Sequence, residues 1–160
     1  MCEVESEKKK NSQSGFSLIE LIIVGLIIAI MATLALPAIQ RTLQLYRLET
    51  GTSNVINRLT ETRLSAIKRN RQTWLEINTA NRTLNMKSTN EAGQQISLGS
   101  PTYLPEGVQF NGVTPGSIIF TSLGRNNANA VTQINLKLSS VNRSKTISIG
   151  ATGNITTAGS

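Results

Sequence analysis

The chain has 160 residues and a net charge of +7, and 39% of its residues are hydrophobic while only 16% are charged. This length suits one globular domain, and the composition is too apolar for a disordered chain. The sequence contains no histidine, no aspartate and one cysteine, Cys2, so it offers no Ser-His-Asp or Cys-His catalytic site, no His- or Cys-based zinc site and no intrachain disulfide. Its glutamates are scattered, without a close pair for hydrolysis. We therefore expect a protein that is not an enzyme and that uses no metal or cofactor.

An uncharged apolar run near the N-terminus is the strongest feature of the sequence. Residues 21–39 read LIIVGLIIAIMATLALPAI, which as a helix would reach about 28 Å. That length is close to the ~30 Å hydrocarbon core of a bilayer, so the run predicts a membrane-spanning helix. Lysines 8–10 precede it, but the A-x-A cleavage pattern of a removable secretory signal does not follow it. We expect the run to stay in the mature protein.

One acidic residue, Glu20, lies at the start of this apolar region, and it has two interpretations. In the first, Glu20 is an interfacial residue, because the helix dipole favours an acid there and a charge costs less than at mid-bilayer. In the second, Glu20 pairs with a cation in the same apolar layer. Cleavage between Gly15 and Phe16 would create such a cation, the new α-amino group of Phe16.

The segment KKKNSQSGFSLIELIIVGLIIAIMATLALP resembles the type III signal of type IV prepilins and of type II secretion pseudopilins. It has a short basic leader that ends in Gly15, then Phe16 as the first mature residue and Glu20 as the fifth. Pro37 occupies mature position 22, where this family often has a helix-bending proline. The resemblance implies that a membrane aspartyl peptidase, the prepilin peptidase, cuts after Gly15 and N-methylates Phe16. It also implies that Glu20 and Pro37 serve assembly.

Beyond the membrane segment, the apolar spacing predicts that the helix continues to about residue 70. Pro37 lacks the N–H for a helical hydrogen bond, so we expect a bend there while the helix goes on. Apolar residues recur at three- and four-residue spacing, at Ile39, Leu43, Tyr46, Leu48, Val55, Ile56, Leu59, Ala66 and Ile67. Basic residues lie between them, which predicts an amphipathic helix with one apolar stripe for a sheet.

After residue 71 the period changes to two, which is typical of strands. Strands are expected at 74–77, 83–87, 96–98, 108–110, 117–121 and 131–138, with a last strand around Ile147 and Ile149. The segment SPTYLPEG, with two prolines, is predicted to be a loop. The expected bulky core residues are Trp74, Tyr103, Phe110 and Phe120. A helix followed by many short strands predicts an α+β fold.

The C-terminal half is similar to the GspH/FimT family of minor pseudopilins and minor pilins. The similarity rests on the helix end at Ala66-Ile67-Lys68-Arg69, on LPEGV at 104–108, on Phe120 with Gly124, and on the closing Ile147-x-Ile149 and Gly153. It implies a type IV pilin-like fold, in which a long N-terminal helix, membrane-spanning in its first half, packs against a C-terminal antiparallel β domain. The expected parts are a cleaved leader at 1–15, a transmembrane and assembly helix at 16–39, the amphipathic second half of the helix at 40–71 and a β-rich globular head at 72–160.

Together the two resemblances imply a structural subunit that assembles through its N-terminal helix, at the tip of a type II secretion pseudopilus or a type IV pilus. The implied partners are other pseudopilin or pilin subunits, the inner-membrane assembly platform, the prepilin peptidase and the membrane itself. Basic residues flank the apolar run on both sides, so the positive-inside rule does not orient it. The short N-terminal tail and the family imply a single pass through the bacterial inner membrane with a cytoplasmic N-terminus and an external head, followed by a place in the periplasmic or extracellular filament.

The basic composition leaves other functions open. Some relatives in the FimT branch bind DNA during natural transformation and share a Gly-Arg-x-Arg pattern at the last strand, but residues 153–156 here contain no arginine. A different basic patch could serve DNA, formed by Arg125, Lys137, Arg143 and Lys145. The same charges could instead dock acidic partner subunits or simply keep the surface solvated. After the structural subunit and the DNA-binding minor pilin, the third alternative for the whole chain is an unrelated single-pass membrane protein.

Overall fold

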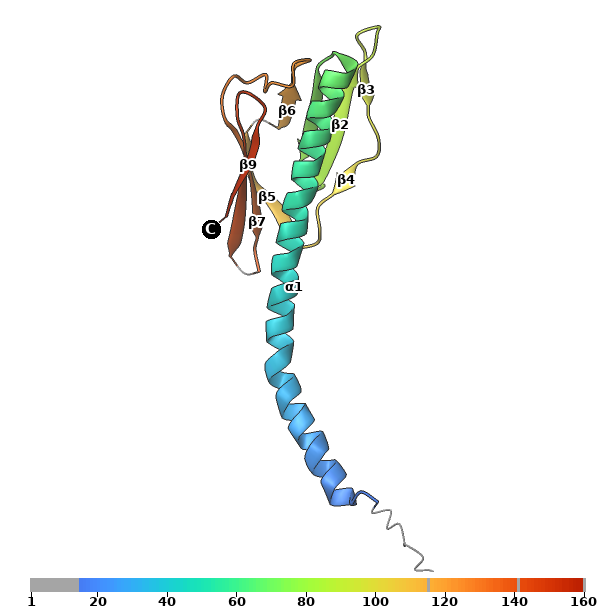
Figure 1. Cartoon of the computed structure of the whole chain (residues 1–160), viewed down its shortest axis with the longest axis vertical. Coiled ribbons are helices and arrows are strands. Elements are labelled where there is room, and N and C mark those ends of the chain that lie inside the picture. Colours follow the sequence, from blue (N-terminus) through green and yellow to red (C-terminus); the bar gives the residue numbers. More distant parts are fainter. Residues whose placement is uncertain (1–14, 115, 141, 160) are drawn as a thin grey trace, which may run out of the picture. The chain divides into compact units, whose positions relative to one another are not determined.

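The computed structural model describes residues 15–114, 116–140 and 142–159. It consists of two compact units, one up to Ile39 and one from Gln40 onward. Figure 1 shows the long N-terminal helix and the strands that follow it in the chain. Except for Gly15, the predicted leader lies outside the described residues, together with Cys2 and the three consecutive lysines.

The longest element is the helix α1 (Leu18–Arg69), of 52 residues. The backbone N–H of Leu21 donates to the carbonyl of Ser17 at 3.2 Å, which makes Ser17 the N-cap residue. Glu20 follows three residues later, which is the spacing of a capping box. At the other end, Asn70 adopts a left-handed conformation (φ 50°), which is typical of the residue after a helix. The predicted continuation of the helix to about residue 70 is confirmed.

In the second unit, one face of α1 is buried. The buried residues recur at three- and four-residue spacing: Leu48, Gly51, Thr52, Val55, Leu59, Thr62 and Ala66. This stripe is shorter than the periodicity predicts, because Leu43 and Tyr46 are 54% and 70% exposed, and Ile67 is 45% exposed at the other end. The apolar periodicity predicts which residues of α1 lie on one side of the helix, but only those that face the sheets are buried.

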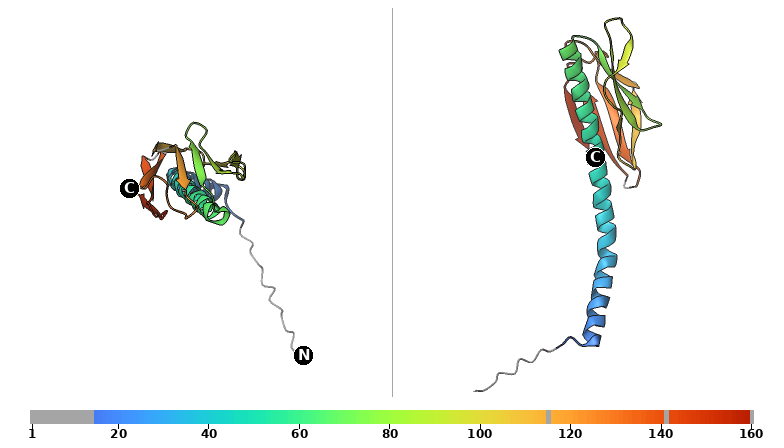
Figure 2. Two further views of the ribbon diagram at one scale, coloured as in Figure 1. Left: turned by 90° about the horizontal axis from the view of Figure 1, so that it is seen from above. Right: turned by 90° about the vertical axis from the view of Figure 1, so that its right-hand side faces the viewer.

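The described residues form two antiparallel sheets beside the C-terminal half of α1 (Figure 2). The first sheet has the order β3-β2-β1-β6, and β4 also pairs with β2. Its strands are β1 (Thr73–Asn78), β2 (Thr83–Thr89), β3 (Gln95–Ser97), β4 (Thr102–Tyr103) and β6 (Ser117–Phe120). The second sheet has the order β5-β7-β8-β9, with strands β5 (Val108–Thr114), β7 (Thr132–Leu138), β8 (Arg143–Ile149) and β9 (Ile155–Gly159).

Alternate residues of both sheets join the helix stripe in one hydrophobic core. Phe120 is the largest fully buried side chain of this core, and the partly buried Phe110 packs against the core. The prediction of a core position is wrong for the other two aromatic residues: Trp74 is half-buried and Tyr103 is 68% exposed. Each is next to a fully or nearly fully buried leucine in the sequence, Leu75 or Leu104, and this smaller side chain occupies the core instead of the ring.

Two strands were not predicted. β4 lies in the segment SPTYLPEG, which was expected to be a loop, and β9 follows the strand that was expected to be the last. Both are short strands of weak β pattern, and each pairs along one side with a longer strand, β2 or β8. β5 also continues past its predicted end at Phe110, through a register shift relative to β7 that contains Gly112 (φ +83°). Tertiary pairing, rather than local preference, defines these three segments.

Two arginines on α1 hold sheet loops against the helix. Arg63 Nε donates to the carbonyl of Gly124 at 2.9 Å, and its Nη2 contacts the carbonyl of Thr152 at 3.4 Å. Arg58 donates to the hydroxyl of Thr102 and to the carbonyl of Ser100. The sequence alone indicated only that these arginines alternate with the apolar stripe. Nothing in it identifies the loops that they bind.

We expect Arg63→Met to lower the free energy of unfolding by about 1–2 kcal/mol, because methionine keeps an apolar stem but loses the charged donors to two carbonyl groups. The measurement is urea unfolding of the full chain in detergent, followed by the fluorescence of Trp74, the single tryptophan. Arg69→Met, at an exposed position at the end of the same helix, is the matched control and should change stability by less than about 0.5 kcal/mol. Equal losses in the two variants would show that the loop contacts of Arg63 contribute nothing.

Candidate processing and assembly segment

The predicted cleavage site lies just before the helix. Residues 15–17 have no regular secondary structure, and the side chain of Phe16 is 85% exposed. A peptide bond in an exposed, non-helical segment is accessible to a peptidase, whereas a bond within a helix must first unfold. The described geometry therefore suits cleavage between Gly15 and Phe16.

Phe16 and Glu20 lie on the same side of the helix start, where they line a shallow hollow with Leu21 and Val24. Glu20 is exposed, and the ion pairs among the described residues do not include it. Its carboxylate is therefore available to a group outside the subunit. Glu20 lies three residues after the N-cap Ser17, which is the position of the acid in a capping box, but the surrounding apolar residues make this pattern hard to recognise in the sequence. Under the interfacial interpretation, Glu20 would therefore also cap the start of the helix.

The first unit exposes an almost entirely apolar helix surface. Its large apolar side chains from Leu18 to Leu36 are each at least half exposed. In the described part of the chain, α1 is the one helix long and apolar enough to cross a membrane, and its most apolar 18-residue window has a mean hydropathy of 2.7 with no residue buried. α1 continues through Pro37. A surface of this kind favours contact with lipid or with other apolar helices, because contact with water costs about 25 cal/mol per Å².

The four basic residues considered for DNA binding do not share one face. In the β7–β8 register, Lys137 lies opposite Ser144, whereas Arg143 and Lys145 lie opposite buried leucines. Because directly opposite residues share a face, Lys137 lies on the other side of the sheet from Arg143 and Lys145. Arg125 lies in the loop between β6 and β7. The structure does not bring the four together, and this arrangement does not support the DNA-binding alternative.

Comparisons with known proteins agree with these observations. Residues 10–36 match the prokaryotic N-terminal methylation motif, a span that contains the proposed cleavage site and Glu20. A search of curated proteins finds no match. The structure is similar to the minor pseudopilin EpsH from the type 2 secretion system of Vibrio cholerae, with a TM-score of 0.58 and 13% identity over 71% of this chain and 97% of EpsH. It is also similar to the type IV minor pilin FimU of Pseudomonas aeruginosa PAO1, with a TM-score of 0.56 and 12% identity over 69% of this chain and 87% of FimU.

At identities of 12–13% these two likenesses establish the fold. They confirm the predicted α+β architecture, with a long N-terminal helix and a C-terminal domain of antiparallel sheets. The methylation motif is a separate finding, since it covers the N-terminal segment and no part of the β domain. The chain therefore combines the prokaryotic N-terminal methylation motif with a fold similar to those of the minor pseudopilin EpsH and the minor pilin FimU.

Proposed function

We propose that this chain is a structural minor pseudopilin or minor pilin, without enzymatic activity, that is built into a type II secretion pseudopilus or a type IV pilus. The observation that carries the proposal is the presence in one chain of the methylation motif and the pilin-like fold. One structural relative comes from each of these two kinds of filament system: EpsH is a minor pseudopilin of a type 2 secretion system, and FimU is a type IV minor pilin. A position at the filament tip stays a prediction.

The exposed apolar surface of the first unit explains how such a subunit serves both as a membrane protein and as a filament protein. Before assembly, lipid of the inner membrane covers residues 16–39, with the N-terminus in the cytoplasm and the head on the other side. During assembly the equivalent helices of neighbouring subunits replace the lipid. Burial of one large apolar side chain is worth roughly 1.5–3 kcal/mol, so the helix leaves the membrane only into another apolar environment. The assembly platform in the membrane supplies the place for this exchange.

Cleavage after Gly15 prepares the subunit for that step. It removes the basic leader and creates the α-amino group of Phe16 at the start of an apolar helix. Methylation of an amine keeps its positive charge. The terminus therefore remains a cation that requires an anionic partner once water is excluded, and Glu20 of a neighbouring subunit is the acid at the matching depth.

Processing is the first test of the proposal. When the full chain is expressed with a prepilin peptidase, we expect it to lose residues 1–15, to keep the apolar segment and to gain one methyl group at Phe16. Mass spectrometry of the intact protein measures all three changes. Gly15→Val should block cleavage, because the residue before the cut must be small. Gly25→Val is the matched control and should be cut normally. Gly25 lies in the apolar helix, and a Cβ there would meet no atom within 4 Å.

Two outcomes would rule out the prepilin assignment. One is a chain that stays uncut beside an active peptidase that processes another prepilin in the same cells. The other is a cut beyond Ile39, which would make the apolar run a removable signal.

A further inference from the structure

A polar pocket of about 540 Å³ lies on the sheet that contains β1, β2 and β4, beside the turn that joins β1 to β2; we call it the turn pocket. Asn78 of β1 lies directly opposite Thr83 of β2, and Thr83 lies directly opposite Tyr103 of β4. Directly opposite residues share a face of a sheet, and Asn85 follows Thr83 by two residues, so these four side chains belong to one face. Leu84, between them in β2, is part of the hydrophobic core. The turn pocket therefore lies on the face of the sheet away from the core.

The turn between β1 and β2 adds an amide and a cation to this pocket, those of Asn81 and Arg82. The backbone N–H of Asn81 donates to Oδ1 of Asn78 at 2.9 Å, a hydrogen bond that is typical of asparagine in turns. Arg82 has a left-handed conformation (φ 55°), which glycine and asparagine adopt most readily. Its guanidinium takes part in none of the ion pairs or side-chain hydrogen bonds among the described residues. The lining contains no acidic residue that would neutralise it.

Thr83 is the most deeply buried of the polar residues that line the turn pocket, with 6% of its surface exposed. Within the described part of the chain, its hydroxyl group has no hydrogen-bond partner, whereas every fully buried polar side-chain atom has one. The Thr83 hydroxyl is therefore not sealed inside the protein and reaches the pocket. A largely buried hydroxyl group without a protein partner is available to a ligand.

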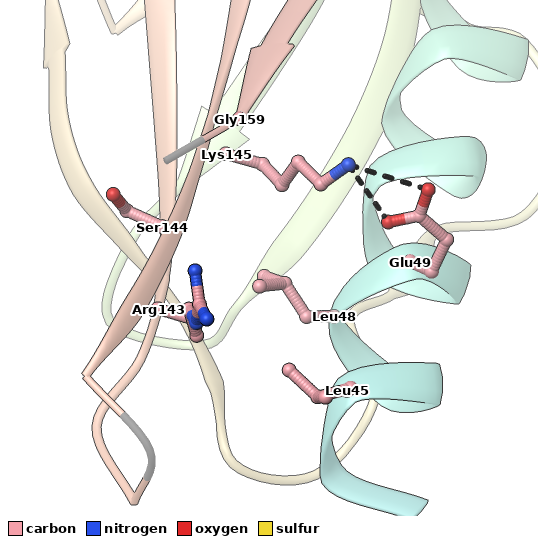
Figure 3. A pocket seen from close by; sticks show the side chains of 7 residues that line it. All are labelled: Leu45, Leu48, Glu49, Arg143, Ser144, Lys145 and Gly159. Atoms are coloured by element: carbon pink, nitrogen blue, oxygen red, sulfur yellow. Dashed lines mark hydrogen bonds and ion pairs between the residues drawn. The ribbon is translucent and has the colours of Figure 1, made fainter. Parts of the chain in front are cut away.

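The pocket between α1 and β8 differs in this respect. Figure 3 shows the side chain of Lys145 directed at Glu49, with Nζ 3.3 and 3.1 Å from the two carboxylate oxygens. This lysine and this glutamate compensate each other inside the chain. Among the described residues Arg82 and Thr83 have no such partners, so the turn pocket is the better candidate for a ligand site.

We propose that the turn pocket binds an acidic saccharide, a sugar chain that carries a carboxylate. Sugar hydroxyl groups both donate and accept hydrogen bonds, and so do the amides of Asn81 and Asn85 and the hydroxyl of Thr83. Tyr103 is 68% exposed, and its ring offers an apolar face to the C–H groups of a sugar ring. The planar guanidinium of Arg82 matches the two oxygens of a carboxylate.

An acidic peptide is the other ligand that an arginine in a polar pocket attracts, and the strand beside the pocket favours it less. A peptide that extends a sheet needs a row of free backbone groups. β4 has two residues, and it lies between Pro101 and Pro105, which have no N–H to donate. All the lining residues belong to the second unit, so the proposal does not depend on membrane anchoring or on assembly.

The test is isothermal titration calorimetry of the full chain in a detergent without a sugar headgroup, with trigalacturonic acid and with its methyl ester. The two ligands have the same sugar rings and differ in charge. We expect the acid to bind about fivefold more tightly, as for a solvent-accessible ion pair. A disaccharide of N-acetylglucosamine and N-acetylmuramic acid carries its carboxylate on a side group. Tighter binding of this disaccharide than of trigalacturonic acid would identify a cell-wall glycan, and the reverse order a uronic acid polymer, as the source of the ligand.

Arg82→Asn should remove the preference for the acid and leave the affinity for the methyl ester nearly unchanged. Asparagine tolerates the left-handed conformation at this position, so the turn keeps its shape. Arg125→Asn is the matched control for net charge, because Arg125 is exposed in the loop between β6 and β7, and it should keep the preference.

Thr83→Val should weaken the binding of both ligands about tenfold, because it removes the hydroxyl group and keeps the shape of the side chain. Thr83→Ser should restore most of the affinity. Thr89→Val is the matched control, since Thr89 lies on the same strand outside the turn pocket, and it should bind as the wild type does. Unchanged Trp74 fluorescence shows that each variant is folded. If Thr83→Val alters this fluorescence, Arg82→Asn decides.

Four outcomes would overturn the proposal. Neither acidic saccharide binds; trigalacturonic acid and its methyl ester bind equally well; folded Thr83→Val and Arg82→Asn variants bind both ligands as the wild type does; or triglutamate or acetate displaces the saccharide fully at equal concentration. Displacement by triglutamate would show a site for acidic peptides, and displacement by acetate a site for any carboxylate.

Discussion

Glu20→Ala should enter the membrane and be cleaved after Gly15 at wild-type levels, yet fail to enter the filament. If Glu20 pairs with the Phe16 ammonium of a neighbouring subunit, as we propose, the variant leaves that ammonium unpaired in an apolar layer of the filament. Removal of one partner of a buried ion pair costs about 3–5 kcal/mol. In the free subunit both groups lie near the membrane interface and reach water, so the cost arises only on assembly. The measurement is the share of processed subunits recovered in the filament, together with cross-linking to the neighbouring subunit.

Glu20→Gln separates charge pairing from helix capping. Glutamine also serves at the third position of a capping box, so a capping role predicts full recovery of assembly. Charge pairing predicts partial recovery, because the amide keeps a hydrogen-bond acceptor but loses the charge. Glu91→Ala, which removes a carboxylate from a side chain that is 95% exposed in the β domain, is the control for net charge and should assemble normally. Incorporation of Glu20→Ala at wild-type levels would leave the interfacial interpretation as the better one.

The long helix α1 could be predicted from sequence because its signals are local and numerous. An uncharged run of membrane length needs no tertiary information to be recognised, and the spacing of Gly15, Phe16, Glu20 and Pro37 agrees with it. The end of α1 was also predicted correctly, because the helical period gives way to an alternating pattern just after Arg69.

The β domain was predictable only in outline. Strands with clean alternation, such as β7, were found within one residue of their bounds. β4 and β9 were missed because short strands at the side of a longer one depend on that partner, and neither has an alternating apolar pattern of its own. Trp74 and Tyr103 were assigned to the core from their size, yet their smaller neighbours Leu75 and Leu104 are buried there, while Trp74 is half-buried and Tyr103 is exposed.

The sequence also could not predict which basic residues lie together on one surface. Lys137, Arg143 and Lys145 lie close together in the sequence, but only the pairing of β7 with β8 determines that the first faces away from the other two. Arg63 is one of several arginines on α1, and only the fold brings Gly124 and Thr152 to its guanidinium. Pairwise contacts between distant segments therefore decide which charges act together, and no pattern along the chain records them.

Gly153→Ala should cause the largest loss of stability among single changes in the loops of the β domain. Gly153 is buried with φ +81°, and a Cβ there would lie 2.1 Å from the carbonyl oxygen of Gly124 and 2.9 Å from Nε of Arg63. The left-handed conformation alone costs a residue with a side chain roughly 1–2 kcal/mol. The clash must also move backbone, which typically costs about 1–3 kcal/mol, and it separates Arg63 from the carbonyl that it binds. We expect a total loss of more than about 3 kcal/mol in urea unfolding followed by Trp74 fluorescence.

Gly93→Ala isolates the contribution of the clash. Gly93 has a similar φ of +77°, but a Cβ there meets no atom within 4 Å, so this variant should show the conformational cost alone, about 1 kcal/mol. The double variant Arg63→Met with Gly153→Ala gives a second check. If the clash already breaks the Arg63 contact, then Arg63→Met should cost less in the Gly153→Ala background than in the wild type, as expected for residues that share a partner. Equal losses for the two glycine variants, or strict additivity in the double variant, would show that the close approach of Gly153, Gly124 and Arg63 does not determine the stability of this part of the fold.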